Sequence, residues 1–217
     1  MQRVPEPELM TDEEQAIAYA NADFEEPHNH FIELLKESVG KDLPESGCAL
    51  DLGCGAADIS IRFAKAFPNY FVDAIDGAEA MLAEGKKAVV NSALEHRINL
   101  IRANLQETSL DRKTYSVLFS NSLLHHLHDP MVLWNLIKTA EVEPKIFIMD
   151  LMRPGSEDLI DGFVEEYAGD EPEVLKRDFG NSLKAAFTPE EVRTQLAEAE
   201  LALTVSVVSD RHLTISG

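Results

Sequence analysis

The stretch from Ala49 to Phe67, ALDLGCGAADISIRFAKAF, constrains the fold of this chain more than any other part of the sequence. It begins with a few mostly apolar residues, as a buried strand does, and Gly53 and Gly55 follow at once. Apolar side chains then recur at helical spacing. A strand that ends in a glycine turn and opens into a helix brings bare backbone and a helix N-terminus against a ligand. The stretch therefore predicts a ligand-binding turn within an α/β fold.

Strands and helices alternate along the chain after this turn, which predicts a mostly parallel sheet covered by helices on both faces. The expected strands span residues 48–52, 70–75, 98–103, 115–120 and 145–151. Two more alternating apolar segments, 201–207 and 213–215, are separated by a short turn. Strands joined so closely must be antiparallel. We therefore predict a three-layer sandwich whose seven-stranded sheet ends in an antiparallel C-terminal hairpin.

Helical segments flank this predicted core domain, which we expect at residues 45–217. Residues 1–44 predict a polar arm and two helices, which would form a cap or lid. The first helix is expected to begin at Thr11, with Glu14 completing a capping box, and the second follows Pro27. Residues of about 156–187 are helical and acidic and predict an insertion over the edge or mouth of the sheet.

The net charge of the chain limits the classes of partner that it can bind. With 217 residues and a formal net charge of −20, the chain repels phosphate backbones, and its basic residues form isolated pairs without a patch. Nucleic acid is therefore a disfavoured partner. The N-terminal residues lack an apolar signal core, and no later segment approaches about 18 apolar residues. We expect a cytoplasmic protein without membrane contact.

Two common ligands of glycine turns fit this stretch poorly. The dinucleotide fingerprint requires a third glycine at position 58, where this chain has Asp58. A carboxylate in the first helical turn would face the pyrophosphate and repel it, which disfavours a nicotinamide oxidoreductase. A phosphate-binding loop is also excluded, because no Gly-Lys-Ser/Thr follows. A neutral or cationic ligand remains open.

The segment LDLGCGAAD resembles motif I of the class I S-adenosylmethionine (SAM) methyltransferases, with Asp51, Gly53, Gly55 and Ala57 at the motif positions. Ala57 stands where the family more often has a third glycine. SAM carries a sulfonium and an ammonium but no phosphate, so carboxylates such as Asp58 would attract it. The resemblance implies a Rossmann-like fold, SAM as cofactor and S-adenosylhomocysteine (SAH) as product.

Later positions of the family pattern also have counterparts in this chain. The resemblance implies that Asp76, followed by Gly77, binds both ribose hydroxyls, since a carboxylate has two acceptor oxygens. It also implies that Met81 or Leu82 lies beside the adenine. Asn104 and Leu105 correspond to the polar residue against the adenine amine and its neighbour.

The segment FSNSLLHHLHDP resembles motif IV of the family, in which residues matching Asn121, His125 and His126 lie beside the transferable methyl group. If the methyl acceptor is a hydroxyl or a protonated amine, His126 is the first choice as general base and His125 the second. His128 and Asp129 extend this cluster, but Asp129 is expected to cap a helix, and crowded neighbours rarely converge on one ion. No metal site is therefore expected.

The resemblance implies in-line transfer of a methyl group to a small-molecule acceptor. Methylation of a protein or tRNA, and a non-catalytic SAM-binding module, remain the alternatives. Residues that could contact the acceptor are Tyr19, Asp150, Arg153, Arg177 and Asn181. Among them, Arg153 follows the fifth predicted strand and could bind an anionic acceptor.

Overall fold

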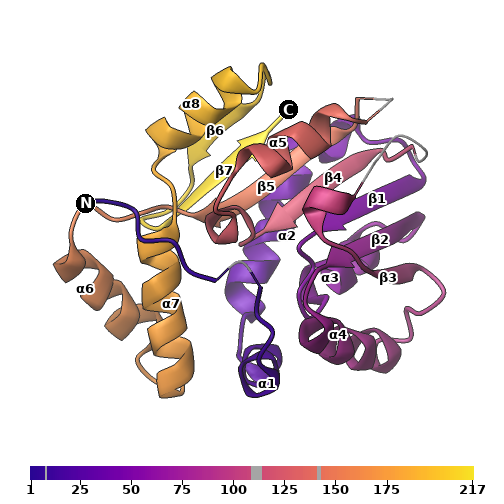
Figure 1. The fold of residues 1–217 in the computed structure, drawn as a ribbon. Coiled ribbons are helices and arrows are strands. Elements are labelled where there is room, and N and C mark those ends of the chain that lie inside the picture. The colour runs from indigo at the N-terminus through magenta and orange to yellow at the C-terminus, as the bar shows by residue number, and fades with distance from the viewer. Residues whose placement is uncertain (8, 109–113, 141–142) are drawn as a thin grey trace.

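The computed structural model describes residues 1–7, 9–108, 114–140 and 143–217 (Figure 1). Its centre is a seven-stranded sheet in the order β3-β2-β1-β4-β5-β7-β6. The strands are β1 Gly47–Leu52, β2 Tyr70–Asp76, β3 Ile98–Arg102, β4 Val117–Asn121, β5 Lys145–Leu151, β6 Thr204–Val207 and β7 His212–Ser216. The α-helices are α1 Glu13–Asn21, α2 Glu25–Ser38, α3 Asp58–Ala66, α4 Glu79–Asn91, α5 Met131–Lys138, α6 Glu157–Ala168, α7 Glu173–Ala185 and α8 Pro189–Glu198. Short 3-10 turns are η1 Gly40–Asp42, η2 Leu105–Glu107 and η3 Leu124–His126.

The order of the strands creates a crevice in the middle of the sheet. The chain starts at β1, moves outward through β2 and β3, and then returns to β4 on the other side of β1. β1 is parallel to both neighbours, with Ala49 opposite Val72 of β2 and Val117 of β4. Ligands of open α/β sheets bind outside the carboxyl ends of the strands at such a reversal.

The C-terminal hairpin confirms the predicted mixed sheet. β7 pairs antiparallel with both β5 and β6, so the last strand runs against the parallel core. The predicted boundaries differ slightly from the observed ones. β4 begins at Val117, two residues later than expected. β6 begins at Thr204, where its pairing with β7 begins, whereas the expected strand included residues 201–203.

Two apolar layers fill the space between the sheet and its helices. Along β4, Val117 and Phe119 face the core covered by α2 and α3, whereas Leu118 faces the core covered by α5 and α8. This alternation follows from the two-residue period of a strand. Phe119 stacks on Phe63 of α3 with ring centroids 4.7 Å apart. Helices therefore cover both faces, as the alternation of elements predicts.

The first helices begin at other residues than expected. Asp12, and not Thr11, caps α1, because its carboxylate accepts a hydrogen bond from the Gln15 amide at 2.9 Å. α2 starts at Glu25, so Pro27 lies within its first turn. Proline is tolerated there because amides of the first turn lack intrahelical partners.

Residues 156–187 are helical, as predicted, and form α6 and α7. α7 contacts both α1 and the η3 turn, which brings it to the carboxyl ends of the strands (Figure 1). The sequence Thr-Pro-Glu-Glu at 188–191 has the pattern of a capping box, and this box is present at the start of α8, since Thr188 and Glu191 bind each other's backbone amides. Within the described part of the chain, every helix is too short or too polar to cross a bilayer.

Candidate active site

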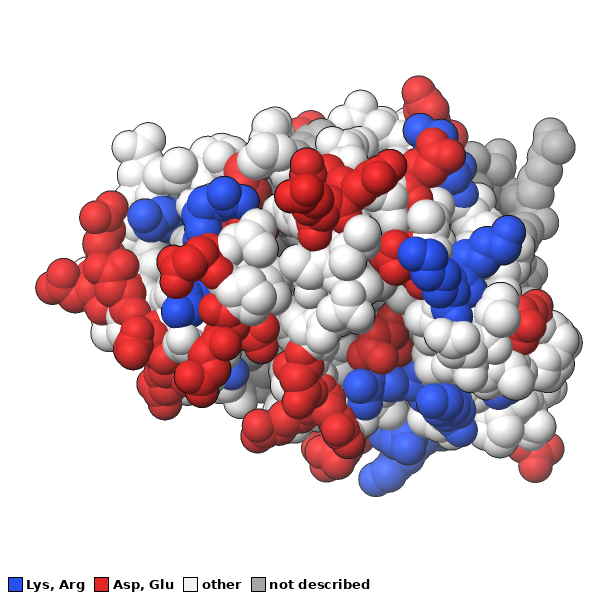
Figure 2. Space-filling view, turned by 90° about the horizontal axis from the view of Figure 1, so that it is seen from below, with Lys and Arg blue, Asp and Glu red and all other residues white. Residues whose placement is uncertain are grey.

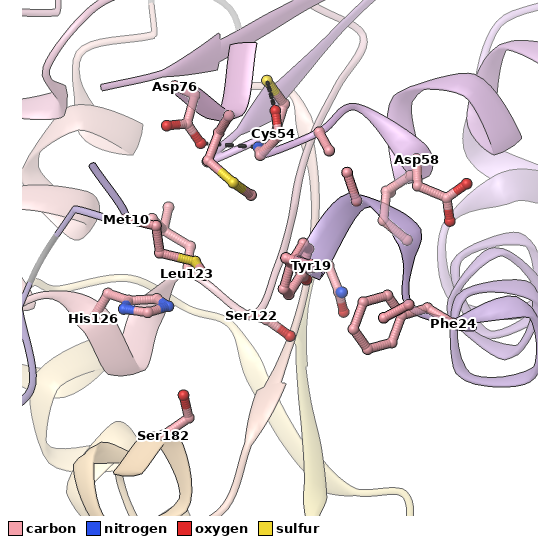
Figure 3. A pocket seen from close by; sticks show the side chains of 18 of the residues that line it. Met10, Tyr19, Phe24, Cys54, Asp58, Asp76, Ser122, Leu123, His126 and Ser182 are labelled. Carbon is pink, nitrogen blue, oxygen red and sulfur yellow. Dashed lines mark hydrogen bonds between the residues drawn. The ribbon is translucent and has the colours of Figure 1, made fainter. Parts of the chain in front are cut away.

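A cavity of about 1540 Å³ opens at the carboxyl ends of the central strands (Figure 3). Its walls come from the loops after β1, β2, β3 and β4, from α1 and α7, and from the start of the chain. We call residues 1–7 and 9–10 the N-terminal arm. The loop after β1 lies on one side of this cavity, and the η3 turn lies on another.

The loop after β1 has a backbone that requires glycine. Gly53 and Gly55 both have positive φ angles, 73° and 52°. A Cβ atom at Gly53 would lie 2.7 Å from Leu123 Cδ1, so no larger residue fits there. Ala57 also adopts a left-handed φ of 66°. It therefore occupies the third glycine position at the cost of a backbone strain that glycine would avoid.

Asp76 at the end of β2 connects this loop to the next one. Its Oδ2 accepts a hydrogen bond from the Gly55 amide and its Oδ1 from the Ala78 amide, each at 2.8 Å. Burial raises the pKa of Asp76, although these backbone amides oppose the shift. Each carboxylate oxygen has a second lone pair. The group can therefore accept two further hydrogen bonds, as a cis-diol would supply.

Asp51 provides a second carboxylate at the same place. Its side chain is buried and accepts a hydrogen bond from Ser60 Oγ at 2.5 Å. Burial raises the pKa of Asp51 to about 7, and the charge of Asp76 adds to the shift. The buried carboxyl of Asp51 and the half-buried carboxyl of Asp76 together disfavour an anionic ligand and would be stabilised by a cationic one.

Asp58 lies at the cavity wall, but its carboxylate is directed toward α2. It is 2.6 Å from His28 Nδ1 and accepts a hydrogen bond from Arg62 Nε at 2.7 Å. Burial alone would raise the pKa of Asp58, but these two partners lower it below its ordinary value. Because its charge is compensated, its repulsion of phosphate is weaker than the sequence argument assumed.

The loops after β3 and β4 also line the cavity. Asn104 caps η2, with its Oδ1 3.0 Å from the Gln106 amide, and Leu105 follows it along the cavity. Asn121 ends β4 and also lines the cavity. The next residue, Ser122, has a positive φ of 56°. Such strain in a residue other than glycine is often found where a loop must present a functional group.

The η3 turn contains His125 and His126, the two histidines predicted at this site, and His125 contacts the buried carboxylate of Asp150. Asp150 of β5 lies 2.6 Å from His125 Nδ1 and accepts the Leu124 amide at 2.6 Å. Burial opposes the charging of His125, but Asp150 outweighs it and raises the pKa of His125. Burial and the neighbouring His125 lower the pKa of His126 to about 3. His126 is therefore neutral near pH 7, and its ring faces the cavity (Figure 3).

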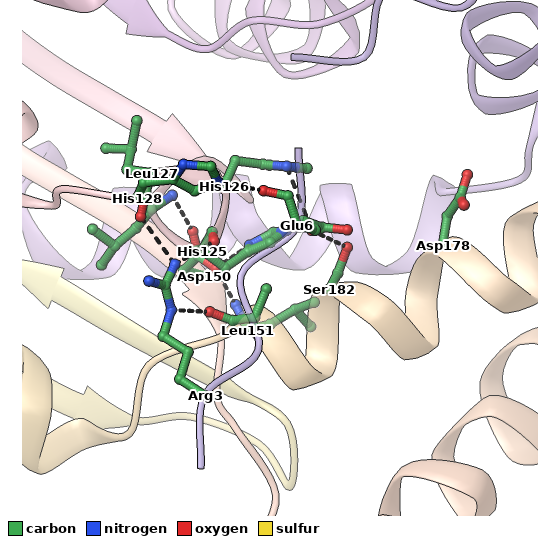
Figure 4. Close-up of polar contacts among 12 residues, drawn as sticks. Arg3, Glu6, His125, His126, Leu127, His128, Asp150, Leu151, Asp178 and Ser182 are labelled. Atoms are coloured by element: carbon green, nitrogen blue, oxygen red, sulfur yellow. Dashed lines mark hydrogen bonds and ion pairs between the residues drawn. The ribbon is translucent and has the colours of Figure 1, made fainter. Parts of the chain in front are cut away.

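The N-terminal arm completes this side of the cavity, which the sequence did not predict. Arg3 Nη2 donates hydrogen bonds to the carbonyl oxygens of His125 and Leu127 at 2.8 and 2.9 Å. Its guanidinium also lies 3.9 Å from the ring centroid of Phe187. Glu6, further along the arm, is directed toward the two histidines and accepts a hydrogen bond from Ser182 Oγ at 2.9 Å (Figure 4).

A family profile described as "Methyltransferase domain" matches residues 49–140, which include the glycine loop, Asp76 and both histidines. Residues 49–140 are therefore similar to a methyltransferase domain, and this similarity includes the loop and the turn that line the cavity.

Curated relatives of this chain are similar to it over only part of their length. A malonyl-[acyl-carrier protein] O-methyltransferase of Ilyobacter polytropus is 30% identical over 86 residues, which are 40% of this chain and 31% of that protein. A demethylmenaquinone methyltransferase of Halalkalibacterium halodurans is 29% identical over 115 residues, 52% of this chain and 46% of that protein. The chain thus spans less than half of the length of either relative.

Solved structures share the fold of this chain over nearly its whole length. A putative SAM-dependent methyltransferase from Methanococcus maripaludis has a TM-score of 0.72 at 18% identity, and the match covers 98% of this chain and 96% of that one. The plantazolicin methyltransferase BpumL, in complex with a pentazolic desmethylPZN analog and SAH, has a TM-score of 0.68 at 15% identity, and the match covers 94% of this chain and 90% of that one.

The residues of the cavity fit SAM. The buried carboxyl of Asp51 and the half-buried carboxyl of Asp76 suit the ammonium and the ribose hydroxyls, and the glycine loop leaves room for a ligand against its backbone. Met81 also lines the cavity, where a Cβ at Gly55 would lie 3.0 Å from its Cε. Gly77 lines it next to Leu9 of the N-terminal arm.

Of the five residues expected to contact the acceptor, three line the cavity and two do not. Tyr19, Arg177 and Asn181 line the cavity, whereas Asp150 and Arg153 do not. Asp150 is buried behind His125. Arg153 donates hydrogen bonds to the Ala186 carbonyl at 2.8 Å and to Glu191 at 2.6 Å, and thus supports the start of α8. The expectation that Arg153 holds an anionic acceptor is therefore corrected, since the chain after β5 turns it away from the cavity.

Proposed function

We propose that this chain transfers the methyl group of SAM to a small molecule that is neutral or cationic. The observation that carries the proposal is one shared cavity. The glycine loop with Asp51 and Asp76 lies on the same cavity as His126 of the η3 turn. A donor held at the first group would therefore face an acceptor held at the second.

The proposed chemistry is an in-line displacement in which SAM supplies a methyl group already activated by its sulfonium. The protein's task is then to align the acceptor with that methyl group at near-attack distance. Asp51 would bind the ammonium of the donor, and Asp76 would hold its ribose hydroxyls. Asn104 and Leu105 would contact the adenine. Exclusion of water from the cavity would keep the acceptor atom unsolvated and reactive.

The helices outside the sheet are available to close the cavity. α1 contributes Tyr19 to the wall, and α7 contributes Arg177 and Asn181. These two helices contact each other across the cavity mouth, where Gln15 Nε2 donates a hydrogen bond to Asp178 at 2.6 Å. We include α1 and α7 in the proposal as a lid that must part for the ligands to exchange.

His126 is the side chain proposed to orient the acceptor. Its imidazole is neutral near pH 7 and faces the cavity, so it can form a hydrogen bond with a hydroxyl or an amine of the acceptor. A pKa of about 3 makes it a weak base, which favours orientation over complete proton removal. His125 and Asn121 complete the polar wall around the proposed acceptor position.

The charges that line the cavity support the proposed acceptor class. Among the described residues, the Lys and Arg side chains that line it are each paired with a carboxylate. The pairs are Arg62–Asp58, Lys87–Glu84, Arg177–Asp178 and Arg211–Asp210. Unpaired cations are what an anionic acceptor would need. Figure 2 shows that acidic side chains also dominate the face seen from below, which disfavours a tRNA acceptor.

Calorimetric titration with SAH tests the proposed donor site. Asp76→Ala should abolish SAH binding, because it removes the acceptor of both ribose hydroxyls and the contact to the Gly55 amide. His126→Ala is the matched control in the same cavity, and its SAH affinity should stay close to that of the unchanged chain while its turnover falls. Unchanged SAH affinity in Asp76→Ala would refute the assigned site.

The acceptor itself can be identified from its product. The chain should be incubated with isotope-labelled SAM and a cell extract, and the labelled molecules separated by charge and analysed by mass. We expect the label in small neutral or cationic compounds. Label in RNA, or only in strongly anionic molecules, would contradict the proposed acceptor class.

A further inference from the structure

Three acceptor atoms converge at the inner end of the cavity, where the N-terminal arm meets the η3 turn (Figure 4). Glu6 Oε1 lies 3.5 Å from His125 Nε2 and 3.4 Å from His126 Nδ1. The ligand atoms of the three side chains all lie within 4.8 Å of one another. Neither Glu6–His distance corresponds to a well-formed hydrogen bond, so the three atoms surround a common point without bonding each other.

The hydrogen bonds around the cluster leave lone pairs directed at this point. His125 Nδ1 is bonded to the Asp150 carboxylate, which assigns a proton to Nδ1 and leaves Nε2 toward Glu6. His126 Nδ1 is buried and has no hydrogen-bond partner. Ser182 donates to Glu6 Oε1 and so stabilises the carboxylate in its orientation. Buried polar atoms without a partner are rare in folded proteins and call for an explanation.

The charges nearby favour a cation at this point. Glu6 and Asp150 are acidic, and Asp178 on α7 is close enough to affect Glu6 electrostatically. Arg3 is the basic side chain close to the cluster, but its guanidinium is directed at backbone carbonyls and at the Phe187 ring. When both imidazoles are neutral, which is the state that binds a metal ion, the carboxylates of Glu6 and Asp150 outnumber the guanidinium of Arg3 among the described residues.

We propose that Glu6, His125 and His126 bind a divalent transition-metal ion. Two imidazoles and a carboxylate are a ligand set that suits Zn²⁺, Co²⁺ and Fe²⁺ and is poor for Mg²⁺ and Ca²⁺. Ligands about 2.1 Å from a tetrahedral ion are about 3.4 Å apart, which matches both Glu6–His distances. Asp150 and Ser182 are the outer partners that orient two of the ligands, as is usual in metal sites.

The sequence argued against a metal because it considered a different set of ligands. Asp129 caps α5, with its Oδ1 2.9 Å from the Met131 amide, as expected. His128 Nε2 lies 2.7 Å from the Glu6 carbonyl oxygen and so bonds to the arm. The third ligand of the proposed site comes instead from Glu6, more than a hundred positions away in the chain.

The ion would act on the acceptor, and this part of the inference rests on the proposed function. A hydroxyl of the acceptor bound to a divalent ion becomes more acidic and more readily forms the attacking oxygen. The carbon–oxygen bond forms as the methyl–sulfur bond of SAM breaks, SAH leaves, and the hydroxyl proton passes to solvent. Metal binding itself requires only the three side chains and is testable without any acceptor.

Cobalt titration of the tag-free, full chain after treatment with a chelator tests the site. We expect one Co²⁺ to bind per chain, with visible absorption bands of a four- or five-coordinate ion, and Zn²⁺ to displace it. Glu6→Gln and His126→Ala should each weaken Co²⁺ binding by at least about tenfold, as should Ser182→Ala by removal of an outer partner. His30→Ala is the matched control, because His30 is an exposed histidine on α2 away from the cluster.

The outcomes separate this inference from the proposed function. Stoichiometric Co²⁺ binding that Glu6→Gln and His126→Ala abolish and His30→Ala preserves would support the site. Failure of the unchanged chain to bind Co²⁺ or Zn²⁺, or binding that persists in both cluster variants, would overturn it. SAH titrations of the same samples measure binding at the donor site. If the unchanged chain fails to bind SAH, this result would contradict the proposed function and leave the metal site unaffected.

Discussion

Gly85 on α4 determines how closely this helix approaches the glycine loop. A Cβ atom there would lie 3.3 Å from the Ala56 backbone and 3.3 Å from the Ala57 Cβ. Ala57 cannot easily retreat, because it is buried and held in a left-handed conformation. The single hydrogen at Gly85 thus permits the helix–loop contact that shapes one wall of the cavity.

We predict that Gly85→Ala destabilises the chain by about 1–3 kcal/mol, because overpacking outweighs the better helix propensity of alanine. SAH affinity should fall as well, since the loop must move. Gly162→Ala on α6 is the control, because no atom lies within 4 Å of its added Cβ. The free energy of unfolding of Gly162→Ala should rise by up to about 1 kcal/mol. Urea unfolding measures both, and equal effects of the two changes would contradict the argument.

Asp51 predicts a pH dependence of cofactor binding. Burial raises its pKa to about 7, so the carboxyl is largely neutral below that pH and ionised above it. Its ionisation therefore costs stability in the free protein, and this cost grows as the pH rises from about 4 toward about 7. A cationic ligand favours the ionised form, which means that the ligand binds more tightly once Asp51 has lost its proton.

We expect SAH affinity to fall as the pH is lowered from about 8 to about 6, and Asp51→Asn to flatten this profile. Calorimetric titration across the pH range, with SAH in one buffer series, gives the measurement. A profile in Asp51→Asn as steep as that of the unchanged chain would show that another group is responsible for the dependence.

The N-terminal arm behaves as an element of the fold although it contains neither helix nor strand. The Val4 amide donates a hydrogen bond to the Lys184 carbonyl at 3.0 Å, and Arg3 binds carbonyls of both the η3 turn and the end of α7. Leu9 then packs beside Gly77, next to the proposed ribose position. The arm thus connects the proposed acceptor side of the cavity to its donor side.

Arg3→Ala should release this arm from the rest of the fold. Hydrogen exchange of the Val4 amide, followed by nuclear magnetic resonance, should accelerate by about tenfold or more, because several charge-assisted hydrogen bonds are lost. Gln2→Ala, at an exposed neighbouring position, should leave the rate unchanged. An exchange rate in Arg3→Ala equal to that of the unchanged chain would mean that Arg3 does not hold the arm.

Local sequence patterns predicted the helices and strands well where interactions between neighbouring residues determine the structure. The strand–glycine–helix unit, the Thr188 capping box and the hairpin all follow from neighbouring residues. The sequence pattern predicted Thr11 as the N-cap of α1, but Asp12 caps the helix. Both residue types can cap a helix, and the sequence alone does not show at which of the two adjacent residues the helix begins. The arm could not be placed, since nothing in its few polar residues specifies a docking surface.

On the scale of the whole molecule, the mostly parallel sheet with its antiparallel hairpin could be predicted, because strands and helices alternate along the chain and the last two strands are joined by a short turn. Asp76 and His126, whose roles at the cofactor and the methyl group the resemblance implied, both line this cavity. Arg153 could not be judged in advance, because its contacts with Glu191 and Ala186 arise only once α8 is packed. Glu6 was missed for the same reason, since a contact between distant segments has no local signature.

The distance along the chain between the arm and its partners has a consequence for biosynthesis. Arg3 binds the Ala185 carbonyl, 182 positions later, and Glu6 binds Ser182, 176 positions later. A ribosome delivers the arm long before its docking surface on α7. Strands β1 to β5 can therefore assemble while the first residues still lack their partners, and the cavity acquires its Glu6 wall only after α7 has emerged. Because the closure of such long loops is slow, we expect the arm to dock late in folding.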